Sequence, residues 1–280
     1  MNQTVDTNEY NTLAKSIKRK RRLIIVLTFI VVFITIAVCS PATVEIMEES
    51  VFEYKGVSPI ITVSIIIVIL LCELFAYAYV SVPLSTSMDK EVNPQKHLIL
   101  NSTLNTKNLN FIIVTDSLYM GDFKAALEYV TPSLYHKNPS IVNAALFNKA
   151  RCEFFLGDYT SLKSTAEQYE LSLSNINMNA KAKEVCGKMQ KIVKLLVALA
   201  ENDKEKIAEY HGIDSWNDSK ATEGYVNYLK GLSAYKLNDN DEAIYRLMYV
   251  KEHCQLTIFA QLAEQHLSNL KCEKEAQTNE

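Results

Sequence analysis

Hydrophobic and polar residues are distributed unevenly along this chain. Residues 23–39 and 60–82 are almost entirely apolar, whereas the sequence beyond residue 84 mixes apolar and polar positions at helical spacing. Helices over the two apolar runs would cover ~25 and ~34 Å, enough for each to cross a bilayer. Helices in soluble cores usually keep a polar stripe, and neither run has one. The pattern predicts two transmembrane helices, with a buried core helix as the alternative for each.

The charges that flank these runs predict their orientation. Residues 1–22 carry six Lys or Arg against two acidic residues, whereas residues 40–58 carry four Glu and one Lys. By the positive-inside rule, the basic arm and the long C-terminal region are cytoplasmic and the acidic loop is external. A secretory signal is the alternative for the first run, but no convincing cleavage pattern follows it. We expect a multi-pass integral membrane protein with both termini in the cytoplasm, in the plasma membrane of a bacterium.

The basic arm also raises the question of nucleic-acid binding. Its charges directly precede the apolar run and have no interleaved aromatic residues, and the whole chain has a net charge of −3. A nucleic-acid surface normally needs a larger basic patch on a folded domain. Membrane lipid is therefore an expected partner and nucleic acid is not.

Glu73 is the one ionisable residue inside either apolar run. A charge at the bilayer centre costs ~3 kcal/mol on insertion scales, so such a residue usually has a partner or a function. Thr28 lies at a similar depth on the first predicted span, where its hydroxyl could donate to Glu73. Helix packing and proton or ion handling both remain open as roles for these two polar residues.

Composition favours a helical fold for the rest of the chain. The sequence has seven Gly and six Pro, few for sheet folds that depend on tight turns. An Asn93-Pro94 breaker marks residues 85–104 as a linker. We therefore predict an all-α protein: a basic arm (1–22), a transmembrane helical hairpin (23–84), this linker, and a helical domain (105–280).

A short turn sequence recurs in the helical domain. Gly-Asp-Phe at 121–123 and Gly-Asp-Tyr at 157–159 are 36 residues apart, and weaker copies stand at 199–203 and 236–240. Gly can take the left-handed conformation that ends a helix, and Asp can cap the next helix. Each copy therefore predicts a helix–turn–helix.

These turns resemble those of the tetratricopeptide repeat (TPR) family, in which a Gly-Asp-Tyr turn joins paired helices. Ala126 and Ala243 occupy the small site of second helices, and Gly231 that of a first helix. The resemblance covers about residues 105–254 and implies a TPR-like α-solenoid. Residues 255–270 would form a helix that caps the stack. An irregular helical domain without a shared groove is the alternative.

First helices line the binding groove in that family, so the resemblance nominates a set of groove residues. They are Asn108, Phe111, Thr115, Asn148, Arg151, Phe155, Tyr225, Tyr228 and Leu232. Repeats that clamp chaperone C-terminal carboxylates have Lys and Asn where this chain has Phe111 and Thr115. A protein or peptide is the implied partner, but a chaperone tail is not.

Motifs for catalysis and cofactor binding are missing from the sequence. There is no phosphate loop, dinucleotide glycine motif, nucleophile elbow or zincin histidine pair. The five His are dispersed and the six Cys show no paired spacing, so neither a metal site nor a disulfide framework is expected. We predict no cofactor, and an enzyme with unrecognised residues is the least favoured reading.

The predicted function is that of an interaction adaptor or scaffold. Two spans would hold the helical domain at the cytoplasmic membrane face, where its groove binds a protein or peptide. The alternative is a small subunit or regulator of a membrane transporter or complex, in which Glu73 is functional. The sequence does not indicate an oligomeric state.

Overall fold

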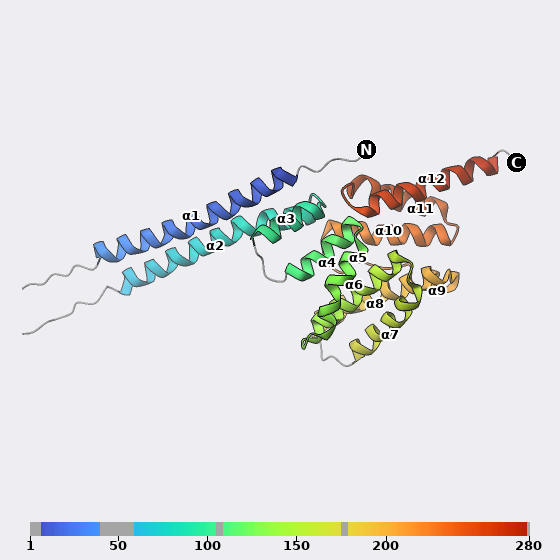
Figure 1. The fold of residues 1–280 in the computed structure, drawn as a ribbon, viewed down its shortest axis with the longest axis horizontal. Coiled ribbons are helices and arrows are strands. Elements are labelled where there is room, and N and C mark those ends of the chain that lie inside the picture. Colours follow the sequence, from blue (N-terminus) through green and yellow to red (C-terminus); the bar gives the residue numbers. More distant parts are fainter. Residues whose placement is uncertain (1–6, 40–58, 105–108, 175–178, 279–280) are drawn as a thin grey trace, which may run out of the picture. The chain divides into compact units, whose positions relative to one another are not determined.

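The computed structural model describes residues 7–39, 59–104, 109–174 and 179–278 (Figure 1). All regular elements within these ranges are helices, and the same ranges contain no strand. The all-α fold class predicted from composition is therefore confirmed. The chain divides into two compact units, Met1–Leu84 and Ser85–Glu280.

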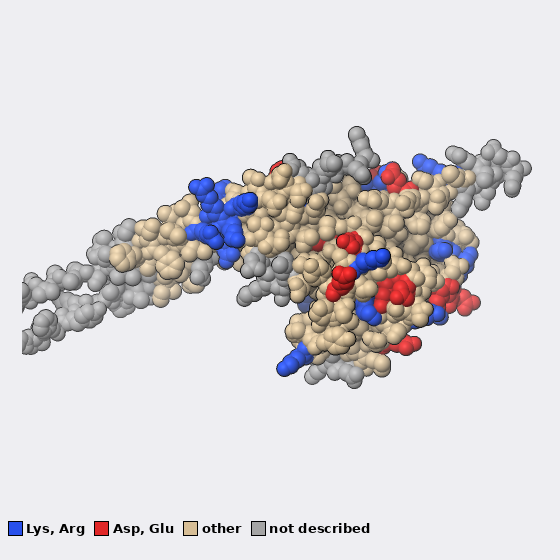
Figure 2. Space-filling model, in the orientation of Figure 1, with Lys and Arg blue, Asp and Glu red and all other residues tan. Residues whose placement is uncertain are grey.

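Two long helices build the first unit. Helix α1 spans Thr7–Cys39 and α2 spans Pro59–Asp89. Helix α1 begins well before the apolar run, so it includes most of the basic arm, whose Lys and Arg side chains gather on one stretch of the helix (Figure 2). Pro59 begins α2, a position that suits proline because the first helical residue needs no N–H donor.

Large apolar side chains on these helices are exposed. Phe29 is 72% exposed, Phe33 is 74% exposed and Phe75 is 67% exposed. Within the described ranges, one segment, Ile66–Asp89, is long and apolar enough to cross a membrane, with a mean hydropathy of 2.1. The second span expected at 23–39 is not established by the structure, and the loop at 40–58 lies outside the described residues.

The segment at 85–104, predicted as a linker, is mostly helical. Helix α2 continues through its first residues, and α3 spans Pro94–Leu104. In the turn between them, the Asn93 N–H donates to the Ser87 carbonyl at 2.7 Å, and Val92 takes a φ of 49°. Helix α2 therefore ends at Asp89, within the segment that was predicted as a linker.

Consecutive helices pack against one another through the second unit. After α3 they are α4 (Leu109–Met120), α5 (Phe123–Val130), the 3-10 helix η1 (Thr131–Tyr135), α6 (Pro139–Leu156), α7 (Tyr159–Ser174), α8 (Ala180–Glu201), α9 (Lys204–Tyr210), α10 (Lys220–Lys236), α11 (Asn240–His253) and α12 (Ile258–Thr278). The longer helices among them, such as α6 and α10, bury many of their residues in these contacts.

The recurring turn has the predicted geometry. Gly121 and Gly157 have φ values of 85° and 74°. The Asp122 carboxylate accepts from the Ala125 N–H at 3.1 Å, and Asp158 caps α7 in the same way. Asn takes the left-handed position in the two weaker copies, where the following Asp caps the helix: Asn202 with Asp203, and Asn238 with Asp239.

The last helix returns to the first part of the unit. Helix α12 contacts α4, and a β-carbon added to Gly121 would lie 2.9 Å from Cγ1 of Ile258. Two residues earlier, near the end of α4, the Tyr119 ring packs edge-on against Phe259 with centroids 5.5 Å apart. The series of helices is therefore closed by contact between its two ends.

Aromatic rings fill the space that an open solenoid would leave as a groove. The Phe155 ring on α6 lies 6.1 Å from Tyr228 on α10 and 5.5 Å from Phe259 on α12. Tyr225 completes the cluster at 5.0 Å from Phe259. The structure thus shows an all-helical unit with a shared aromatic core, and it does not establish an open TPR-like solenoid.

Candidate functional site

The residues predicted to line the groove lie in different environments. Five of them are buried: Asn148, Arg151, Tyr225, Tyr228 and Leu232. Phe155 is half-buried among the aromatic rings, whereas Phe111 is 49% exposed near the start of α4 and Thr115 lies one turn later. Asn108 lies outside the described residues. The structure therefore brings most of this set together as core rather than as an accessible surface.

Arg151 is at the centre of this core and is only 1% exposed. Its guanidinium carbon lies 4.1 Å from the centre of the Tyr225 ring. The rings of Tyr119, Phe147 and Trp216 surround the same group at 5.3 to 5.5 Å. Cation–π contacts can be worth about 2 kcal/mol or more each when they are desolvated, so these rings offset part of the cost of burying the charge.

The hydrogen bonds of Arg151 are incomplete. Nη1 donates to the Asn148 side-chain oxygen at 3.1 Å, but Nε and Nη2 have no partner in the described part of the chain. Burial raises the pKa of the Tyr225 hydroxyl to about 12, although the nearby Arg151 charge lowers it. Because this cluster is closed to solvent, we interpret Arg151 as a core residue that joins α4, α6 and α10.

A second buried charge on α6 is paired. Lys149 Nζ lies 3.0 Å from the carboxylate of Glu153, which is 2% exposed, and donates to the Thr165 hydroxyl on α7 at 2.7 Å. This explains how a lysine is accommodated on the packed side of α6. These contacts fix α6 to α7, while the second carboxylate oxygen of Glu153 has no hydrogen-bond partner in the described part of the chain.

Of the predicted intramembrane pair, the structure describes the side chain of Thr28. The Thr28 hydroxyl donates to the Ile24 carbonyl within α1 at 2.8 Å. Glu73 lies on α2, and its side chain is outside the described set. The role of Glu73 therefore stays a prediction.

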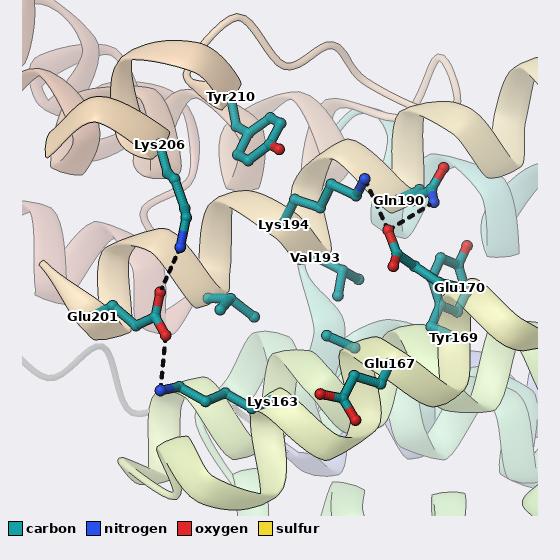
Figure 3. A pocket seen from close by; sticks show the side chains of 12 residues that line it. Lys163, Glu167, Tyr169, Glu170, Gln190, Val193, Lys194, Glu201, Lys206 and Tyr210 are labelled. Atoms are coloured by element: carbon teal, nitrogen blue, oxygen red, sulfur yellow. Dashed lines mark hydrogen bonds and ion pairs between the residues drawn. The ribbon is translucent and has the colours of Figure 1, made fainter. Parts of the chain in front are cut away.

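A surface hollow of about 300 Å³ lies between α7, α8 and α9, and we call it the α7–α9 groove (Figure 3). It is lined by Lys163, Ala166, Glu167, Tyr169, Glu170, Gln190, Val193, Lys194, Val197, Glu201, Lys206 and Tyr210. A groove of this size is within the range of protein ligand sites.

One end of the groove is crossed by an ion-pair network. Glu201 on α8 bonds Lys163 on α7 at 2.7 Å and Lys206 on α9 at 3.3 Å (Figure 3). Hydrogen bonds from both lysines lower the pKa of Glu201. The network links the three helices that form the walls, although its exposure limits its contribution to stability.

The other end is closed by a second polar group. Glu170 on α7 lies 2.8 Å from Lys194 on α8 and accepts a 3.3 Å hydrogen bond from Gln190. The hydrogen bond from Lys194 lowers the pKa of Glu170 and raises the pKa of the lysine. Lys194 also lies 5.9 Å from the centre of the Tyr210 ring.

Between these ends the groove is apolar, with one free carboxylate. Ala166 and Val197 are half-buried on its floor, and Val193 is buried there. Glu167 is exposed on α7 and makes no ion pair or hydrogen bond with any described residue. Figure 3 shows its side chain on the α7 wall, apart from both networks. The groove can therefore hold an apolar group on its floor and a cationic group at Glu167.

The described ranges contain no metal-binding cluster, and two of their thiols are buried in the core. No group of three or more His, Cys, Asp or Glu side chains lies in a metal-binding arrangement there. Burial raises the pKa of the Cys152 and Cys254 thiols to about 12, so neither is a ready nucleophile.

No protein-family model, curated protein or solved structure matches this chain. The likeness to the TPR family therefore rests on the turn sequences described above.

Sequence reasoning missed the α7–α9 groove. The family resemblance directs attention to first helices, whereas α7 is a second helix and α8 belongs to the weakest repeat copy. A signal was present, because Lys163, Glu167 and Glu170 recur at helical spacing along one face of α7. Such a pattern is usually a solvated face, so only the packing of α8 and α9 shows that this one borders a hollow.

Proposed function

We propose that the protein is a membrane-anchored adaptor, in which a TPR-like helical domain at the cytoplasmic face binds a protein or peptide in the α7–α9 groove. The observation that carries the proposal is the groove itself: an apolar floor, ion pairs at both ends and a free carboxylate at Glu167. Such a site suits a partner that places an apolar side chain on the floor and a Lys or Arg beside Glu167.

The anchor is the second part of the proposal. We infer two spans, at about 23–39 and 60–82, with the basic end of α1 in the cytoplasm. The exposed apolar surface of α1 and α2 supports this arrangement, because contiguous apolar patches of that extent are rare on soluble proteins. Engineered cysteines test it in intact cells: an impermeant thiol reagent should label Glu48→Cys but not Asn105→Cys. The opposite pattern would overturn the orientation.

Photo-crosslinking at position 168, beside Glu167, tests the groove. A partner captured there should be lost with Glu167→Lys, which replaces attraction of a cation by repulsion, and kept with Glu252→Lys, a matched charge reversal at an exposed position on α11. Loss of a charge-paired contact should weaken affinity at least tenfold. If both variants capture the partner equally well, the groove is not its binding site.

A role as a subunit or regulator of a membrane transporter is the second proposal. It rests on the position of Glu73 within the apolar segment Ile66–Asp89. The two proposals differ in which single substitution abolishes function.

A further inference from the structure

The end of α5, helix η1 and the first turn of α6 form an exposed aromatic surface, residues 129–141, which we call the tyrosine tip. Tyr135 is 84% exposed, Tyr129 is 45% exposed and Ile141 is 37% exposed. Phe111, 49% exposed in the first turn of α4, belongs to the same end, because Val114 one turn later packs with Val130 of α5.

The tyrosine tip is rigid. The Thr131 hydroxyl donates to the Leu127 carbonyl at 2.8 Å, and Asn138 caps α6 by accepting from the Ser140 N–H at 3.0 Å. A small apolar cluster beneath it includes partly buried Leu134. The backbone that carries the exposed rings is therefore held by the fold, so little backbone entropy would be lost when they dock.

The charged side chains within the tyrosine tip are basic. Residues 129–141 contain no Asp or Glu, and their ionisable side chains besides tyrosine are the exposed His136 and Lys137. The α7–α9 groove, by contrast, carries both signs of charge. Exposed Glu128 lies just before this range. Within the range, tyrosines, aliphatic side chains and a cation match the interface of an anionic bilayer, where tyrosine rings lie at headgroup depth.

Chain direction places the tip on the side where the chain enters the second unit. The turn at 90–93 reverses the chain after α2, and the His97 to Asp116 contact of 2.8 Å joins the start of α3 to the end of α4, which makes these helices antiparallel. The turn at Gly121 reverses the chain again. Helix α5 therefore ends on the side of the second unit where Ser85 lies.

We propose that the tyrosine tip docks into the headgroup region of the bilayer that the protein is anchored in, and so gives the helical domain a second membrane contact. The inference rests on the membrane attachment proposed above. Docking at two points would hold the domain in one orientation, with its groove at a defined height above the membrane.

The test uses the full-length protein in liposomes of phosphatidylcholine with about 30% phosphatidylglycerol, which supplies the negative surface potential. An environment-sensitive fluorophore replaces Tyr135 through Tyr135→Cys in a Cys186→Ser, Cys272→Ser background. Tyr159→Cys is the matched control, since Tyr159 is also 45% exposed but begins α7 at the opposite end of α6. Nitroxide lipids should quench the fluorophore at position 135 and leave it bright at position 159.

A charge variant separates docking from chance proximity. Near an anionic membrane each Lys contributes about 1 kcal/mol, so Lys137→Gln should lower the ratio of docked to undocked domains about fivefold. Lys124→Gln, which removes an exposed charge at the other end of α5, should leave it unchanged. Equal quenching at positions 135 and 159, in protein that resists carbonate extraction, would overturn the docking inference and leave the anchor intact.

Two other results are also decisive. Protein that carbonate removes from the liposomes would overturn the proposed anchor and this inference together. A crosslinker at position 135 that captures one protein in cells, while the same position stays unquenched in liposomes, would show that the tip binds a protein instead of lipid.

Discussion

The guanidinium carbon of Arg151 lies 4.1 Å above the ring of Tyr225, inside a core that leaves the arginine 1% exposed. This relationship changes how the predicted groove is to be tested. A substitution at Arg151 alters the packing of α4, α6 and α10 and does not merely change a binding surface.

Arg151→Glu should therefore unfold the helical unit or destabilise it by about 4 kcal/mol or more, because it places a buried anion among ring faces that repel it. Arg151→Met should cost no more than about 2 kcal/mol, since it keeps apolar volume without a charge. Urea titrations followed by Trp216 fluorescence measure both. Lys124→Glu, on an exposed position, is the control. A folded, stable Arg151→Glu protein would contradict the closed core.

Gly121→Ala tests the contact between α4 and α12. The new β-carbon would lie 2.9 Å from Ile258, whereas the equivalent atom in Gly157→Ala would meet nothing within 4 Å. Both glycines have positive φ, so both substitutions carry a backbone strain of about 1 kcal/mol. Gly121→Ala should cost about 1 kcal/mol more by overpacking, and Ile258→Ala should remove this excess. Equal losses for the two glycine variants would mean that α12 does not close on α4.

Asp116 should make stability depend on pH. Burial raises its pKa from 3.8 to about 6, although the hydrogen bond and charge of His97 lower it. The folded state thus binds the proton more tightly than the unfolded state, so this group favours folding most below about pH 4. The advantage falls as the pH rises to about 6, by up to about 3 kcal/mol. The free energy of unfolding of the wild type, minus that of Asp116→Asn, should decrease over this window. A constant difference would show that Asp116 is not shifted.

Glu73→Gln distinguishes the two proposed functions. The amide keeps a hydrogen-bonding group but cannot exchange a proton, so an adaptor should lose at most ~1 kcal/mol of helix association and keep its partner. A transporter component that depends on ionisation should lose function completely. Partner capture and growth of cells carrying the variant measure the two outcomes. Loss of function with Glu73→Gln, together with full activity of Glu167→Lys, would favour the transporter role.

Local features of the fold were predictable because they depend on neighbouring residues. The Gly-Asp turns at 121–122 and 157–158 form as expected, since a left-handed glycine and an aspartate cap need no distant partner. The helical state of 85–104 was missed, because the Asn93-Pro94 breaker marks a helix start as well as a loop.

Long-range packing could not be predicted in the same way. Helical periodicity shows that Tyr225 and Tyr228 belong to a buried face, but it does not identify which helix covers them. The resemblance to an open repeat placed these residues on a groove, whereas Phe155 and Phe259 fill that space. The α7–α9 groove could not be predicted for the same reason, because it forms only where three helices pack together.

The closure of α12 onto α4 also determines when the helical unit can mature during synthesis. An open array of repeats can fold progressively as each pair leaves the ribosome, because every pair needs only its neighbour. Here the Tyr119 ring can make its contact with Phe259 only after Phe259 has been translated, so the aromatic core cannot form completely before then. Contacts so distant in sequence slow folding and prolong exposure of apolar surface. Chains that terminate before Ile258 should therefore be recognised by chaperones and proteases as unfinished, even though most of their helices are present.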